Sequence, residues 1–315
     1  MPSFRLTPVQ PFRLDLTAWV LRRRPNNGWD VWDGETYRRV LVIEGAAREV
    51  SVAQVREELA VQISGARLST RAKGEAIAAL RRLLGIDIDL STFYRFARSD
   101  RRLAQLAERF RGFKPPRFLS VFEALANGIA CQQLSLTVGI ILLNRLVERY
   151  GRKLGRHHAF PEPNRLSSLN PEELMPLGYS RNKARFLIDL AQAISDNGLQ
   201  PASLEEASDR EALANLQQLR GIGRWTAEYV LLRGLGRTNI FPCDDVGARN
   251  NLERWLKLRT PLTYESAHCV LKRWAPFGGL IYFHLLMDQQ ERLGYLGEPP
   301  EQSGGEPSGR ARPIF

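Results

Sequence analysis

A pair of glycines between two helical segments constrains this chain more than any other feature of its sequence. In "QQLRGIGRWTAEYVLLRG", Gly221 and Gly223 stand between an amphipathic segment and an apolar one that begins near Trp225. Glycines permit backbone angles and close approaches that side chains forbid, and N–H groups are left free where the second helix begins. The stretch predicts a helical hairpin whose turn can bind an anion. A plain hairpin that uses glycine only to turn explains the same residues.

The net charge indicates which anion to expect. The 315 residues include 45 Lys and Arg against 34 Asp and Glu, which gives a formal charge of +11. Because arginine guanidinium groups match phosphate oxygens, this excess favours a polyanion partner. A solvated basic surface is the alternative. If the anion is a DNA phosphate, Gly221 and Gly223 lie against it and Thr226 adds a hydroxyl donor.

Two adjacent aspartates follow the hairpin. In "NIFPCDDVGARNNLERWL", Pro242 ends the incoming segment, and Asp244 is predicted to cap a helix that begins around Val246. Asp245 then lies in the first turn, where the helix dipole and free amides favour its ionised form. The alternative is that both aspartates cap and charge-match a helix without any chemistry.

The rest of the chain reads as a mixed region followed by a helical one. "YRRVLVIEGAAREVSVAQV" predicts paired strands on either side of Gly45, and "STRAKGEAIAALRRLLG" predicts a helix capped by Ser69 or Thr70 and ended by Gly85. "GFKPPRF" interrupts the helical pattern, so we expect a mixed strand and helix domain over residues 1–111 and a helical core over residues 112–293. Residues 294–315, rich in Gly, Pro, Ser and Glu, are predicted to be a disordered tail.

These motifs together resemble a known family. "LRGIGRWTAEYVLLRGLGRTNIFPCDD" resembles the hairpin, the Gly/Pro-rich loop and the catalytic aspartate of the helix-hairpin-helix DNA glycosylase superfamily. "GIGRWTAEY", "FEALANGIACQQLS" and the mixed N-terminal region resemble the bacterial 3-methyladenine DNA glycosylase II group. The resemblance covers roughly residues 12–293 and implies an α+β fold. A small N-terminal mixed α/β-sheet domain would precede an all-α helix-hairpin-helix glycosylase core, which could comprise two helical subdomains.

The resemblance implies a monofunctional DNA glycosylase of base excision repair. Such an enzyme flips an alkylated base, of the 3-methyladenine or 7-methylguanine type, out of double-stranded DNA and excises it, leaving an abasic site. Asp245 would be the catalytic carboxylate and Asp244 the neighbouring helix cap. Relatives that also cut the backbone carry a lysine nucleophile just after the hairpin; here that position is Trp225, so no lyase activity is expected.

Two aromatic residues are candidates for the base pocket. Trp225 and Tyr229 are one helical turn apart and can face the same side. In the resembled group such rings stack on electron-poor, often cationic, alkylated purines. Packing into the core is the alternative for both. Val246, Gly278 and Leu286 stand where relatives carry other residues, which predicts a less aromatic and roomier pocket.

Further residues are candidate DNA contacts. Gln133 falls where the resembled family inserts a side chain into the gap left by the flipped base, and Leu134 is the neighbouring candidate for this wedge. Arg181 and Lys183, in "GYSRNKARFL", match a second backbone-contacting turn. Each of these positions could instead belong to a solvated helix terminus.

No cofactor is expected to be required. The resemblance implies a structural Na⁺ or K⁺ at the hairpin, held by the backbone carbonyls of Gln217, Leu219 and Ile222. Three scattered cysteines do not suggest a disulfide framework, a zinc site or an iron–sulfur cluster. The sequence has no apolar run long enough to span a bilayer, so we expect a cytoplasmic protein, associated with the nucleoid. The resemblance implies a monomer whose partner is damaged double-stranded DNA.

Two other functions remain open at this point. A bifunctional glycosylase/lyase for oxidised purines shares the fold but needs a lysine at position 225. A non-catalytic helix-hairpin-helix DNA-binding protein also explains the charge and the glycines. The second alternative predicts that Asp245→Asn leaves all function intact.

Overall fold

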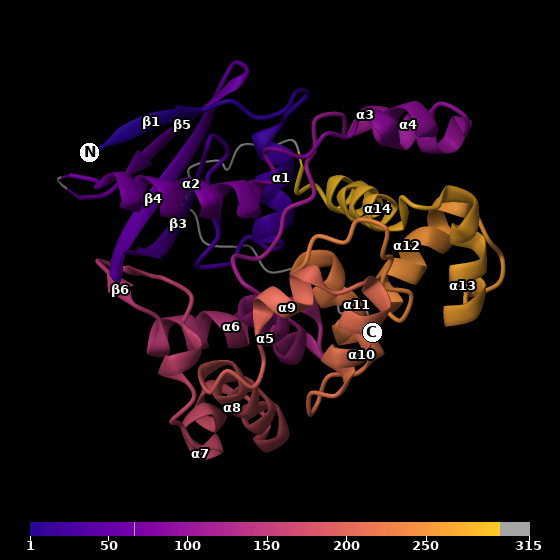
Figure 1. Cartoon of the computed structure of the whole chain (residues 1–315). Coiled ribbons are helices and arrows are strands. Elements are labelled where there is room, and N and C mark those ends of the chain that lie inside the picture. The colour runs from indigo at the N-terminus through magenta and orange to yellow at the C-terminus, as the bar shows by residue number, and fades with distance from the viewer. Residues whose placement is uncertain (66, 297–315) are drawn as a thin grey trace, which may run out of the picture.

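The chain is α+β, as the sequence predicts. The computed structural model describes residues 1–65 and 67–296, and in this part of the chain a five-stranded antiparallel sheet precedes a helical region (Figure 1). The predicted disorder of residues 297–315 lies outside the described residues. No helix among those described is long and apolar enough to cross a membrane.

The sheet has the strand order β1-β5-β4-β3-β2. β3 and β4 join at Glu44 and Gly45, which both have positive φ, and Ile43 pairs with Ala46. The predicted paired strands around Gly45 are therefore confirmed. Alternate side chains of the strands face the core, as the pleat requires. The strands are β1 Ser3–Leu6, β2 Val31–Trp32, β3 Thr36–Ile43, β4 Ala46–Val55 and β5 Glu58–Ile63.

Two helices, α1 Leu14–Arg22 and α2 Thr70–Leu84, share a hydrophobic core with the sheet. α2 has the predicted ends: the Ser69 hydroxyl accepts from the Ala72 N–H, and Gly85 closes the helix at a φ of 58°. α1 also faces a second core, because Leu16 and Val20 pack among residues of the helical region. α1 therefore lies between the sheet and the helices, where Figure 1 also shows it.

The helical region surrounds one central helix, α5 Val121–Cys131, whose residues from Val121 to Ala130 are all buried. It packs against α6, α8 and α11. The remaining longer helices are α3 Ser91–Ala97, α4 Arg101–Arg109, α6 Leu136–Tyr150, α8 Arg181–Ser195, α10 Asp209–Gln217, α11 Arg224–Arg233, α12 Val246–Leu256, α13 Tyr264–Leu271 and α14 Gly278–Arg292. Shorter elements are β6 Lys153–Leu154, β7 His157–His158, η1 Pro163–Arg165, α7 Pro171–Leu174, η2 Met175–Leu177, α9 Pro201–Glu206 and η3 Lys272–Trp274.

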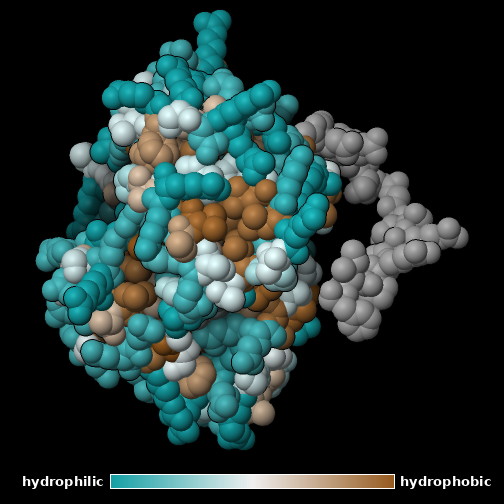
Figure 2. All heavy atoms as spheres, turned by 90° about the vertical axis from the view of Figure 1, so that its right-hand side faces the viewer, coloured by the Kyte–Doolittle hydropathy of each residue, from teal (hydrophilic) through white to brown (hydrophobic). Residues whose placement is uncertain are grey.

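The packing of α3 and α4 bears on how the chain divides. Their buried residues, among them Phe93 and Leu103, belong to the same core as α12 and α14. The sequence places both helices in the N-terminal domain, and the boundary at residues 111 and 112 stays a prediction. Figure 2 shows the face at the right of Figure 1, where apolar atoms gather in the middle and hydrophilic side chains surround them.

Candidate functional site

Asp245 stands at the start of α12 and is held by two donors. Its Oδ1 accepts from the Ala248 N–H at 2.9 Å, and its Oδ2 accepts from the Trp225 indole N–H at 3.2 Å. The first contact caps the helix, and the second joins the aspartate to the first turn of α11. This arrangement fixes one carboxylate beside an aromatic ring at a helix N-terminus, where the peptide dipoles favour negative charge.

The predicted helix cap was placed one residue too early. Asp245, not Asp244, is the N-cap of α12, because its side chain accepts from the Ala248 N–H and the helix begins at Val246. Asp244 instead accepts from the Arg224 guanidinium with both oxygens, at 2.6 Å and 3.1 Å. This ion pair ties the aspartate loop to the start of α11.

The two hairpin glycines have different surroundings. Gly221 has a φ of +80°, and a Cβ there would lie 2.2 Å from the Phe186 ring. Gly223 is the N-cap of α11, is exposed, and would place a Cβ in open space. Gly221 therefore allows internal packing, whereas Gly223 leaves the outer side of the turn clear for a ligand to approach the helix N-terminus. Phosphate contacts at both glycines stay predictions.

The Thr226 hydroxyl is engaged inside the protein, and its contact with a phosphate stays a prediction. The residue is buried, and its Oγ1 accepts from Gln132 Nε2 at 3.0 Å. The same amide group donates to the Gly221 carbonyl at 2.7 Å. Thr226 lies in the first turn of α11 on the side that faces α5, where Gly128 leaves room for its methyl group. Gln132, which the sequence did not single out for this role, thus joins the end of α5 to the hairpin.

Lys183 and Arg181 are both engaged within the protein. Lys183 Nζ donates to the carbonyls of Ala130 and Gln132 at 2.9 Å and 2.7 Å, because the last carbonyls of α5 have no partner in their own helix. A phosphate contact would require Lys183 to leave them. Arg181 is exposed and pairs with Glu172 at 2.5 Å, so it can exchange that partner for a phosphate at little cost.

The turn between α5 and α6 carries the two wedge candidates. Gln133 has a φ of 54°, and Leu134 is 42% exposed. Both line the mouth of a pocket of about 800 Å³ that also includes Asp245. The structure therefore brings Gln133 and Leu134 to the same opening as the aspartate, and it does not separate them as wedge candidates.

The pocket contains the two predicted aromatic residues. The rings of Trp225 and Tyr229 are stacked, with centroids 5.6 Å apart and planes 20° apart. Trp225 is half-buried, whereas Tyr229 is 8% exposed and also packs against Phe118. Val246 is 60% exposed at the rim. The stacked rings and the aspartate form one continuous surface that can hold a planar ligand next to a carboxylate.

One wall of the pocket comes from the N-terminal region, which the sequence did not indicate. Trp19, Val20, Arg23 and Arg24 line it, from α1 and the residues that follow. No local motif marks them, because their partners are distant in sequence: Arg23 donates to the hydroxyl of Tyr229 at 3.3 Å across 206 positions.

α14 contributes Leu286 to the lining, while the two glycines at its start have a packing role. Gly279 donates its N–H to the Thr238 carbonyl at 2.8 Å, and a Cβ there would lie 2.7 Å from that oxygen. A Cβ on Gly278 would likewise lie 2.8 Å from the Asn239 carbonyl oxygen. These glycines let α14 approach the loop before Asp245, and the predicted roomier pocket stays a prediction.

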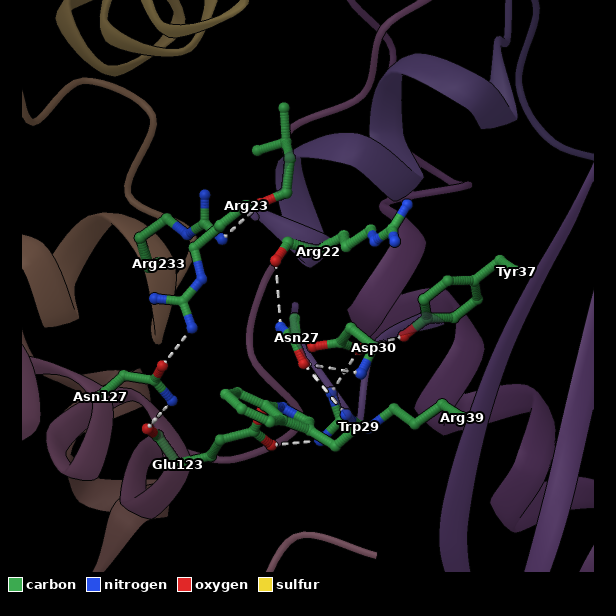
Figure 3. A network of polar contacts seen from close by, with 11 residues as sticks. Arg22, Arg23, Asn27, Trp29, Asp30, Tyr37, Arg39, Glu123, Asn127 and Arg233 are labelled. Carbon is green, nitrogen blue, oxygen red and sulfur yellow. Dashed lines mark hydrogen bonds and ion pairs between the residues drawn. The ribbon is translucent and has the colours of Figure 1, made fainter. Parts of the chain in front are cut away.

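A buried polar network joins the sheet to the pocket (Figure 3). The Arg39 guanidinium contacts Asp30 at 2.9 Å and Glu123 at 2.5 Å, and these three side chains are at most 1% exposed. Asn127 donates to the Glu123 carbonyl at 2.8 Å and accepts from Arg23 at 2.5 Å. We call this network of Arg23, Asp30, Arg39, Glu123 and Asn127 the buried seam.

The hairpin turn offers carbonyl oxygens that suit a monovalent cation. Leu219 accepts from the Ile222 N–H at 3.1 Å, while within the described residues no backbone N–H outside the helices donates to the carbonyls of Gln217 or Ile222. Three carbonyls of one turn are hard oxygen donors of the kind Na⁺ and K⁺ prefer. No cluster of three His, Cys, Asp or Glu side chains that could hold a metal occurs in the described part of the chain. The cation stays a prediction.

Comparisons with known proteins agree with this geometry. The family model "HhH-GPD superfamily base excision DNA repair protein" matches residues 126–276, and the model "AlkA N-terminal domain" matches residues 3–120. The chain is 30% identical over 215 residues to a DNA-3-methyladenine glycosylase of Bacillus subtilis, which covers 67% of this chain and 71% of that protein. It is 31% identical over 158 residues to the putative DNA-3-methyladenine glycosylase YfjP of the same organism, covering 50% of this chain and 55% of YfjP.

The fold is also found among solved structures. The 3-methyladenine DNA glycosylase of Archaeoglobus fulgidus superposes with a TM-score of 0.80 at 27% sequence identity, over 93% of this chain and 100% of that one. Both regions of the chain, the sheet and the helical part, are included in this match. The chain therefore belongs to the HhH-GPD superfamily of base excision DNA repair proteins and carries an AlkA-type N-terminal domain.

Proposed function

We propose that the chain is a monofunctional DNA glycosylase that excises alkylated bases, of the 3-methyladenine and 7-methylguanine type, from double-stranded DNA. Family membership and the 3-methyladenine glycosylases among its relatives support the reaction class. The observation that carries the proposal is the position of the Asp245 carboxylate. It accepts a hydrogen bond from the Trp225 indole and lines a pocket that also contains Tyr229. The product is DNA with an abasic site, which base excision repair then completes.

The geometry suits cleavage of a base–sugar bond. As the bond from C1′ to the base nitrogen breaks, positive charge develops on the deoxyribose, and a fixed carboxylate beside it stabilises that charge. Asp245 can also orient a water molecule for addition to C1′ and accept its proton. The Trp225 and Tyr229 rings stack on the flipped base, and a cationic base gains from contact with their π-faces.

DNA would be held around the mouth of the pocket. The N-terminus of α11 at Gly223 presents free amides to a phosphate, and Arg181 adds a side-chain contact. Gln133 or Leu134 would fill the gap that the flipped base leaves in the duplex. We further propose that the protein acts as a monomer in the cytoplasm, at the nucleoid.

The absence of lyase activity is part of the proposal. A lyase needs an amine nucleophile within reach of C1′. Position 225 is a tryptophan whose indole already contacts Asp245, and no lysine lines the described pocket. A non-catalytic DNA-binding role would explain the helix cap made by Asp245, but not why this carboxylate lines a pocket beside the stacked rings.

The test compares wild type with Asp245→Asn on alkylated duplex DNA. Released bases and heat-labile abasic sites are measured under single-turnover conditions, and borohydride trapping tests for a Schiff base. Asp245→Asn should release bases about 10²-fold more slowly or worse, because the positive charge that develops on the deoxyribose loses the carboxylate that stabilises it. The variant should still bind DNA. Wild type should give no trapped adduct.

A matched control is Asp244→Asn, which removes the adjacent carboxylate but leaves the Asp245 contacts in place. Its loss of base release should be far smaller than that of Asp245→Asn. Base release that survives Asp245→Asn would contradict the catalytic role. Wild-type protein that binds the DNA but releases no alkylated base would contradict the proposed substrate class.

A further inference from the structure

Two buried arginines line the pocket beyond the stacked rings. Arg23 Nη1 donates to the Tyr229 hydroxyl at 3.3 Å and Nη2 donates to Asn127 at 2.5 Å. Arg233, one helical turn after Tyr229, donates to the Val20 carbonyl at 3.0 Å. The two residues are 6% and 1% exposed, and Figure 3 shows them side by side at the junction of α1 and α11. Both belong to the pocket lining.

Neither arginine forms an ion pair with a carboxylate in the described part of the chain. The two nearby acids, Asp30 and Glu123, are both bound by Arg39. Three guanidinium groups thus face two carboxyl groups in this interior, which leaves the pocket wall with excess positive charge. The Nε atoms of Arg23 and Arg233 have no hydrogen-bond partner among the described residues. Buried donors of this kind favour a ligand that supplies an acceptor.

The charges are ordered along the pocket. Asp245 accepts a hydrogen bond from the Trp225 indole, and the Trp225 ring stacks on Tyr229. The Tyr229 hydroxyl in turn accepts a hydrogen bond from Arg23. The carboxylate therefore stands at one end of the stacked rings and the guanidinium at the other. A base flipped onto these rings would have its sugar near Asp245 and its far edge near Arg23.

We propose that Arg23, together with Arg233, determines specificity by stabilising negative charge on the departing base. This inference rests on the proposed glycosylase function and deepens it. It predicts that Arg23 assists the release of a neutral base with an acceptor oxygen at the edge far from the sugar, such as a deaminated purine, more than that of a cationic alkylated purine. A guanidinium is suited to this role because it stays charged when buried and has several donors.

The two kinds of base differ in the charge that they carry away. In both, the electron pair of the bond from C1′ goes to the base nitrogen, water oxygen bonds to C1′, and the water proton passes to Asp245 or to solvent. A cationic base leaves neutral, whereas a neutral base leaves as an anion that afterwards takes a proton from solvent. A fixed positive charge favours the anion and disfavours the bound cation. Arg23 should therefore change the ratio of the two rates.

The experiment measures that ratio in the full chain. Single-turnover release is followed from two duplexes of identical sequence, one with deoxyinosine and one with 7-methyldeoxyguanosine. The ratio of the two rate constants in one preparation does not depend on the folded fraction. Arg23→Gln should lower the ratio of hypoxanthine to 7-methylguanine release by about tenfold, and Arg23→Lys, which keeps the charge, should restore part of it.

The matched control is Arg22→Gln. Arg22 precedes Arg23, is not part of the pocket lining, and donates to the carbonyls of Trp32 and Pro25. Its substitution should leave the ratio unchanged. Arg233→Gln should shift the ratio in the same direction as Arg23→Gln, which keeps the inference testable if the latter protein does not fold.

An unchanged ratio in Arg23→Gln and Arg233→Gln would overturn the inference, and so would a wild type that releases only the cationic base. If wild type releases hypoxanthine in an Arg23-dependent manner but no alkylated base, the inference stands and the proposed substrate class fails. The two proposals can therefore be judged separately.

Discussion

The hairpin and the buried seam hold their charges in opposite ways. At the hairpin, the side chains of the Arg224 and Asp244 pair are 44% and 27% exposed, and both partners lie within one short stretch of sequence. In the buried seam, Arg39, Asp30 and Glu123 are at most 1% exposed, and Glu123 is 84 positions away from Arg39 in the chain. Water screens the first pair, whereas the second cluster depends entirely on its internal partners. The comparison predicts a graded set of mutational effects.

The largest effect is expected in the buried seam. Arg39→Gln leaves Asp30 and Glu123 buried without a cation, which should lower the free energy of unfolding by about 3 to 5 kcal/mol. The neighbouring Arg38 pairs with the half-exposed Asp33, so Arg38→Gln should cost less than about 1 kcal/mol. Urea denaturation of the two variants measures both values. Equal losses would contradict the distinction between seam and surface.

The hairpin glycines should give the next largest difference. Gly221→Ala places a methyl group against the Phe186 ring at a positive φ and should destabilise the protein by about 1 to 3 kcal/mol. Gly223→Ala has an ordinary φ and open space, so its stability should change by no more than about 0.5 kcal/mol. Only the second substitution is expected to weaken DNA binding while stability is kept, which fluorescence anisotropy with a duplex would detect.

Glu228, a buried carboxyl group in α11, should make the stability of the protein depend on pH. Burial raises the pKa of Glu228 above its ordinary value, against the hydrogen bond from the Tyr264 hydroxyl. The folded state thus binds more protons than the unfolded state just above pH 4.5, and this group lowers stability as the pH rises through its folded-state pKa. Glu228→Gln has no charge to bury, so its stability relative to wild type should increase as the pH is raised from about 5 to about 8. Urea denaturation at several pH values measures the difference in stability between Glu228→Gln and wild type. A difference that does not change with pH would contradict the raised pKa of Glu228.

The smallest effect is expected for the surface pair itself. A double-mutant cycle with Arg224→Gln and Asp244→Asn should give a coupling energy below about 1 kcal/mol, because both side chains remain in contact with water. Raising the salt concentration should reduce it further. A coupling energy as large as the loss in Arg39→Gln would remove the distinction between the hairpin and the buried seam.

The same division explains what could be predicted from the sequence. The hairpin, the strands around Gly45 and the ends of α2 follow from local patterns, in which a residue and its partner are a few positions apart. The helix cap was misplaced by one residue because two adjacent aspartates both satisfy the capping pattern, and only the fold shows that Asp245 accepts from the Ala248 N–H while Asp244 pairs with Arg224. The burial of Thr226 was not predicted, because helical spacing does not tell which face turns inward.

The buried seam and the wall formed by α1 could not be predicted in this way. The contact between Arg23 and Tyr229 spans 206 positions, and that between Arg39 and Glu123 spans 84. A lone arginine in a basic chain gives no local sign that it will be buried. Such contacts exist only once the sheet and the helices have packed together, so the part of the site that faces Arg23 became visible only in the structure.

The position of α1 has a consequence for how such enzymes can be taken apart and recombined. A fragment that begins at residue 112 would keep the hairpin, the stacked rings and Asp245, but it would lack Trp19 and Arg23 and so leave the pocket open on one side. The sheet domain is therefore not a detachable module. A chimera that exchanges only residues 1–111 with a relative would keep Asp245 and the stacked rings but replace the pocket wall that Trp19 and Arg23 form.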